Sequence, residues 1–182
     1  MKRMSIKKQM ILLFILISIF FPAKVLSQLI VGQVAPSLSG IKMIDKEFPD
    51  LKNKFVFLDF WATWCTSEVK YLDHLNDLAL RFKVNVVFIA VSSESEVQVR
   101  SLLQNKLWFN MYFGLDIDQI FYKKFLFENI PVYYFISPQN IILSTGIANE
   151  ISDIDLNSLI IQNDSTIFKT GTIIVTTKDS IK

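Results

Sequence analysis

Two hydrophobic patterns alternate along this chain. Short, nearly continuous apolar runs rich in β-branched and aromatic residues are typical of strands that are buried on both faces of a sheet. They predict strands at 55–60, 85–91, 110–115, 132–136 and 141–144. Apolar residues at three- and four-residue spacing predict helices with one buried face at 66–82, about 94–104, 118–125 and 152–161. This order predicts one α/β domain, a central mixed β-sheet with helices on both of its faces.

Three segments lie outside that alternation. Residues 28–50 are punctuated by glycine and proline and predict an irregular lead-in. Ser92 and Ser93 stand where they would cap the helix at 94–104. Residues 167–177, broken by a Thr-Gly pair, predict a β-hairpin within a C-terminal extension at 163–182. The predicted domain therefore spans 28–162.

The first 27 residues have the composition of a targeting segment. Basic residues precede an apolar run at 10–21, which is shorter than the ~20 residues that a transmembrane helix needs. We expect a signal peptide at 1–27 that is cleaved before Gln28. The alternative is an uncleaved membrane anchor. Both interpretations place the domain outside the cytoplasm, in the periplasm or on the outer face of the cytoplasmic membrane.

The net charge changes once this segment is set aside. The chain has 19 basic and 17 acidic residues, and five of the basic residues lie within 1–27. The remaining 14 basic and 17 acidic residues give a net charge of −3. No basic cluster remains that would attract a phosphate backbone, so we expect no nucleic-acid partner and a membrane contact only through an uncleaved N-terminal segment.

Cys65 is the only cysteine of the chain, which excludes an internal disulfide framework. It stands where the strand at 55–60 gives way to the helix that begins near Thr66. Free backbone N–H groups at a helix N-terminus favour a thiolate, the form that attacks disulfides. The alternative interpretation is a structural thiol that is capped and inert. A single histidine without partners at ligand spacing predicts no metal site, and we expect no cofactor.

Three segments in this order resemble the thioredoxin superfamily, and most of all its exported TlpA/ResA-type thiol–disulfide oxidoreductases in the redoxin (AhpC/TSA-like) group. The segments are Trp61-Ala62-Thr63-Trp64-Cys65 after a buried strand, Ile130-Pro131 before another, and the polar turn 137–141. The resemblance covers the chain from Val31 to the last predicted helix. It implies the thioredoxin-like fold and a reactive Cys65.

The chain departs from the family at the reacting residues. The family motif is W-C-x-P-C, and here the second cysteine is replaced by Glu68 and the proline by Ser67. One thiol cannot form a reversible internal disulfide. The charge of Glu68 suits a helix N-terminus. If Glu68 instead faces Cys65, it either disfavours the thiolate or accepts the proton of the thiol.

The resemblance also assigns roles to residues around Cys65. Asp59 matches an acid that lies beneath the active site and moves protons, and an apolar setting would raise its pKa. Ile130 and Pro131 match a cis peptide bond beside which an extended substrate segment binds. Trp64 completes the expected substrate contacts, although tryptophans in this motif are more often packing residues.

Two functions of different classes remain open. The first is a monothiol oxidoreductase in which Cys65, with Glu68 and Asp59, acts on protein thiols and disulfides and is released by an external reductant thiol. The intact run at 61–65 favours it. The second is an inactive thioredoxin-like module that holds a client in the groove at Pro131. The replacements at Glu68 and Ser67 favour this second function, and so does Tyr71, which stands where the family commonly has an acid.

Overall fold

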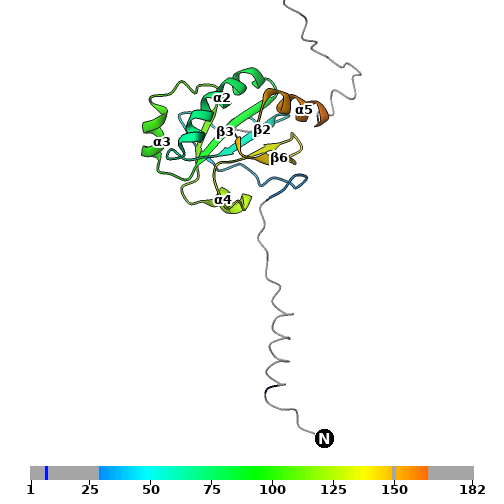
Figure 1. The fold of residues 1–182 in the computed structure, drawn as a ribbon, viewed down its shortest axis with the longest axis horizontal. Coiled ribbons are helices and arrows are strands. Elements are labelled where there is room, and N and C mark those ends of the chain that lie inside the picture. The colour runs from blue at the N-terminus through cyan, green and yellow to red at the C-terminus, as the bar shows by residue number, and fades with distance from the viewer. Residues whose placement is uncertain (1–6, 8–28, 149–150, 164–182) are drawn as a thin grey trace, which may run out of the picture.

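The computed structural model describes residues 7, 29–148 and 151–163 (Figure 1). The predicted C-terminal hairpin lies outside the described residues, and so does the predicted signal peptide, apart from Lys7. The described elements follow the predicted order of alternating strands and helices.

The strands of the described region form one mixed sheet in the order β1-β4-β3-β2-β5-β6. They are β1 (Lys42–Ile44), β2 (Phe55–Phe60), β3 (Val86–Ser92), β4 (Tyr112–Leu115), β5 (Val132–Ile136) and β6 (Ile142–Gly146). β2 is parallel to β3, and β3 is parallel to β4. The pairs β2–β5, β5–β6 and β1–β4 are antiparallel. The mixed sheet predicted from the sequence is therefore confirmed.

Helices cover both faces of this sheet, as Figure 1 shows with α2 and α5 on one side and α4 on the other. Their bounds are α2 (Thr66–Phe82), α3 (Glu96–Leu103), α4 (Ile120–Phe125) and α5 (Asp153–Asn163). Side chains alternate along β2. Phe57 and Trp61 enter the core beneath α2 and α5, whereas Leu58 and Phe60 enter the core beneath α4. Because Asp59 lies between Phe57 and Trp61 in this alternation, its side chain belongs to the face that α2 covers.

Two details differ from the sequence predictions. The lead-in contains β1, whose three residues pair with β4. This pairing brings the chain close to Gly114, where an added Cβ would lie 2.4 Å from Ile41 Cγ2, so a glycine is required there. Helix α3 is capped by Ser95, which forms a capping box with Gln98, and not by the serines at 92 and 93. The prediction failed because Ser92 is still paired within β3.

Candidate active site around Cys65

Cys65 is the N-cap residue of α2 and is partly exposed. Its carbonyl oxygen accepts a hydrogen bond from Val69 N at 3.0 Å, which begins the helix. Its Sγ lies 3.5 Å from Ser67 Oγ, and its side chain does not cap the helix. The thiol therefore stands beside the free N–H groups of the first turn, where a negative charge is stabilised.

A glutamate that the sequence analysis missed holds the turn before Cys65. Glu94 accepts hydrogen bonds from Thr63 N at 2.6 Å and from Thr63 Oγ1 at 2.7 Å. Glu94 follows β3, and the turn follows the parallel strand β2, so both lie at the same edge of the sheet. An acid placed just after the neighbouring parallel strand was the signal that could have identified it.

The two tryptophans of the motif have different environments. Trp61 is fully buried and makes an edge contact with Phe113, with ring centroids 6.0 Å apart. The packing interpretation is therefore right for Trp61. Trp64 is 67% exposed, so the packing interpretation is wrong for Trp64. Its ring is available to a molecule that approaches Cys65.

Asp59 and Glu68 meet in the interior behind Cys65. Asp59 is completely buried, and Glu68 is 1% exposed although it lies in the first turn of α2. Neither oxygen of Asp59 has a hydrogen-bond partner among the described residues, and neither does Glu68 Oε1. Burial raises the pKa of Asp59 well above its usual range, and the nearby Glu68 and Cys65 raise it further.

The burial of Glu68 places its carboxyl group in the protein interior. Burial raises the pKa of this carboxyl group, and its contact with Asp59 offsets part of the rise. A glutamate that served the helix N-terminus alone would extend into solvent. Glu68 is directed into the protein instead, towards Asp59, and burial has a larger effect on its pKa than the contact with Asp59 has.

Tyrosine hydroxyl groups border the two acids. Tyr71 donates a hydrogen bond to Ile151 O at 2.6 Å, and burial followed by the charges of Glu68 and Asp59 raises its pKa. Tyr122 donates to Trp61 O at 3.4 Å, and burial raises its pKa to about 12. These hydroxyl groups stay protonated at neutral pH, so they add no charge to the site.

The Ile130–Pro131 peptide bond is cis, the configuration that the resemblance implies. Ile130 is partly buried and lines an open hollow of about 520 Å³ with residues of α4 and of the loop that follows it. The hollow has an apolar wall at Phe127, whose ring packs on Phe60 at 4.6 Å between centroids. Tyr122 lines the same hollow and reaches Trp61 O, which places the hollow next to the turn that carries Cys65.

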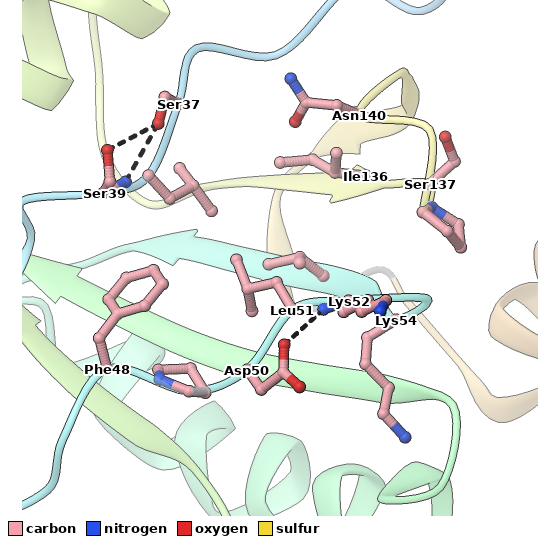
Figure 2. Close-up of a pocket in the computed structure, with 14 residues that line it drawn as sticks. Ser37, Ser39, Phe48, Asp50, Leu51, Lys52, Lys54, Ile136, Ser137 and Asn140 are labelled. Carbon is pink, nitrogen blue, oxygen red and sulfur yellow. Dashed lines mark hydrogen bonds between the residues drawn. The ribbon is translucent and has the colours of Figure 1, made fainter.

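A second hollow lies at the opposite end of β2 (Figure 2). Its volume is about 470 Å³, and Val56 and Ile136 form part of its apolar lining. Several of its polar side chains already have partners within the protein. Asp50 accepts a hydrogen bond from Lys52 N at 2.9 Å, and the hydroxyl groups of Ser37 and Ser39 lie 2.8 Å apart (Figure 2). Because this hollow lies at the start of β2 and Cys65 follows the end of β2, the hollow is remote from the thiol.

Two further features are absent from the described part of the chain. It contains no group of three or more histidine, cysteine, aspartate or glutamate side chains that could hold a metal ion. Within the same residues, no helix is both long enough and apolar enough to cross a membrane.

Comparisons with known proteins agree with this geometry. A family model described as thioredoxin-like matches residues 53–142. The thiol–disulfide oxidoreductase ResA of Bacillus cereus is 32% identical over 96 residues, which cover 49% of this chain and 52% of the relative. ResA of Bacillus subtilis is 29% identical over 119 residues, which cover 63% of this chain and 65% of that protein. The chain thus spans about half to two thirds of the length of the curated relatives it matches.

Solved structures show the same fold. The thioredoxin domain of a thiol–disulfide oxidoreductase from Bacteroides vulgatus superposes with a TM-score of 0.62 at 19% identity, over 75% of this chain and 99% of that one. An exposed lipoprotein thioredoxin from Streptococcus pneumoniae gives a TM-score of 0.57 at 21% identity, over 65% and 95% of the two chains. With the fold, the motif at Cys65 and these relatives in agreement, the chain belongs to the thioredoxin-like superfamily, in the group of ResA- and TlpA-type thiol–disulfide oxidoreductases.

Proposed function

We propose that this protein is an exported monothiol oxidoreductase that acts on protein disulfides through Cys65. The observation that carries the proposal is the placement of the only thiol of the chain, partly exposed at the N-terminus of α2. A thiolate in this position is stabilised by the first turn of the helix and is accessible to a second molecule.

The reaction is one thiol–disulfide exchange. The Cys65 thiolate attacks one sulfur of a client disulfide, a bond forms between Cys65 Sγ and that sulfur, and the other client sulfur leaves as a thiolate that takes up a proton. One client sulfur is reduced to a thiol, and Cys65 is oxidised to a mixed disulfide with the other client sulfur. Because Glu68 stands where a second thiol would attack, the mixed disulfide persists until an external thiol reduces it.

Exposed apolar groups beside the thiol supply a binding surface for the client. Trp64 is largely exposed, and Ile130 borders the open hollow next to the turn. An extended peptide segment with apolar side chains would contact Trp64 and Ile130 while its disulfide approaches Cys65. The proposed export depends on residues 1–27, whose basic and apolar pattern is that of a signal peptide.

The test uses a symmetric dimer of a one-cysteine peptide joined by a disulfide, followed by intact-mass measurement under non-reducing conditions. We expect the full chain to gain the mass of one half of the peptide at Cys65 and to keep it until a thiol is added. Cys65→Ser should gain nothing. In Glu68→Cys, the new thiol should displace the peptide, so that the adduct is short-lived and an internal disulfide remains. Absence of the adduct in the native chain would contradict the proposal.

A second function is favoured by the same apolar surface. A module without reactivity would hold a client between Trp64 and the hollow beside Ile130, with no bond to Cys65. This function predicts equal binding of the peptide by the native chain and by Cys65→Ser. The monothiol function predicts that only the native chain retains the peptide after denaturation.

A further inference from the structure

Among the described residues, the interior behind Cys65 contains two acids and no cation that pairs with them. Asp59 and Glu68 are buried and lie close enough for each to alter the ionisation of the other. The lysine and arginine ion pairs of the described region all involve other acids, namely Asp45, Asp73, Glu96 and Asp153. Two adjacent negative charges without a cation are strongly disfavoured in an apolar interior, so the two carboxyl groups cannot both stay ionised.

The unsatisfied oxygens indicate where a proton resides. Both oxygens of Asp59 and one oxygen of Glu68 have no hydrogen-bond partner among the described residues. A carboxylic acid donates one hydrogen bond, whereas a carboxylate can only accept. One proton between the two groups would provide the donor that the surrounding side chains do not.

The groups around the acids leave Cys65 as the natural proton partner. Tyr71 on α2 and Tyr122 on α4 already donate their hydroxyl protons to backbone carbonyl groups. Tyr133 lies opposite Asp59 in the β2–β5 register, and its hydroxyl contacts Ser144. Tyr71 and Tyr122 are neutral at neutral pH. Cys65 is the remaining titratable neighbour whose charge acts on Asp59, and it also lies at the molecular surface.

We propose that Asp59 and Glu68 form a carboxylic acid–carboxylate pair that holds one proton and exchanges a second proton with Cys65. The inference rests on the proposed monothiol function. When Cys65 attacks a disulfide, the carboxylate of the pair takes the thiol proton, so that both acids become neutral. The doubly protonated pair then returns this proton to the departing client thiolate. The pair ends with one proton, and Glu68 thus supplies a proton-transfer group where the family motif has a second thiol.

The first arm of the test detects the shared proton without any activity. Infrared spectroscopy of the full chain at neutral pH should show the carbonyl band of a protonated carboxyl group. The double variant Asp59→Asn/Glu68→Gln should remove this band, and each single variant should shift it because the remaining buried acid loses its partner, whereas Glu47→Gln, which replaces an exposed acid, should leave it unchanged. Absence of the band from the native chain would overturn the proposed pair.

The second arm measures the rate at which oxidised glutathione forms the Cys65 mixed disulfide, as a function of pH. We expect a titration step in addition to that of the thiol, and we expect both single variants to lose it, with a rate about tenfold lower at neutral pH. Variants that keep the native profile would overturn the proton exchange with Cys65. A native chain that forms no adduct at any pH would overturn the monothiol function itself, while the infrared band would still report on the pair.

Discussion

Two buried aspartates of this protein differ in what surrounds them. Asp116 is 4% exposed, directly after β4, and accepts hydrogen bonds from Ile120 N at 2.8 Å and from Phe121 N and Tyr122 N at 2.9 Å. Asp59 is equally buried on β2, yet neither of its oxygens has a partner among the described residues. Burial alone therefore does not separate the two aspartates, whereas the hydrogen bonds that each one accepts do.

The backbone around each residue explains the difference. Asp116 precedes α4, whose first N–H groups have no partner within the helix and are free to bind a carboxylate. Asp59 lies inside a strand that is paired on both sides, with Ala90 of β3 and Tyr133 of β5. The ladder uses the nearby backbone N–H groups, so a carboxyl group here depends on side chains. Asp116 thus anchors a helix, whereas Asp59 depends on the side chain of Glu68 for a polar contact.

The largest expected effect is that of replacing Asp116, the aspartate that anchors α4. Asp116→Ala removes the acceptor of three N–H groups, of which that of Phe121 is buried and the other two are partly buried, and should lower the free energy of unfolding by about 3 kcal/mol. Urea unfolding followed by circular dichroism would measure this loss. Asp118→Ala, which removes an exposed aspartate two residues away, is the matched control and should change stability little. Equal effects of the two variants would refute the anchoring role of Asp116.

Replacement of the second aspartate, Asp59, is expected to change the free energy of unfolding in the opposite direction. The pKa of Asp59 is higher in the folded chain than in the unfolded chain, so its contribution to stability is greatest in acid and is lost as the pH rises through the folded pKa. Asp59→Asn should therefore raise the free energy of unfolding at pH 8 by about 1–2 kcal/mol relative to its effect near pH 4. Urea titrations of both proteins at both pH values measure this difference. A variant that loses stability equally at both values would show that Asp59 is satisfied after all.

The smallest expected effect concerns Tyr71, which lies beside the two acids. Its hydroxyl group already has a hydrogen-bond partner. Tyr71→Phe removes the hydrogen bond to Ile151 O and should lower the free energy of unfolding by about 1 kcal/mol. Tyr112→Phe is the control, because the hydroxyl group of this partly buried tyrosine has no hydrogen bond within the described residues. Denaturant unfolding of both variants compares them. Equal losses would mean that the bond at Tyr71 contributes nothing.

Much of the fold could be predicted from the sequence, because β2 and β3 are continuous apolar runs and α2 has a regular apolar stripe. The strand β1 could not be predicted, because its three residues are too few to show a hydrophobic periodicity. They become a strand only by pairing with β4. The irregular lead-in predicted at 28–50 was wrong at that point for this reason.

The candidate site was predictable where its residues are close in sequence. Cys65, Asp59 and Glu68 all lie within ten residues of one another, so strand alternation and the first helical turn locate them. Glu94 and Tyr71 were not assigned their contacts, because these join residues 31 and 80 positions apart in the chain. Such contacts depend on which strands are neighbours and on where α5 packs, and no local pattern reveals either.

The proposed chemistry depends on whether Cys65 is an activated thiol in the folded protein. The most direct measurement is the rate of Cys65 alkylation by iodoacetamide in the native chain and in the same chain unfolded in urea, both at pH 7. If the first turn of α2 stabilises the thiolate, the native chain should react faster than the unfolded chain. A native chain that reacts more slowly than the unfolded chain would show a protected thiol, and it would contradict the monothiol oxidoreductase.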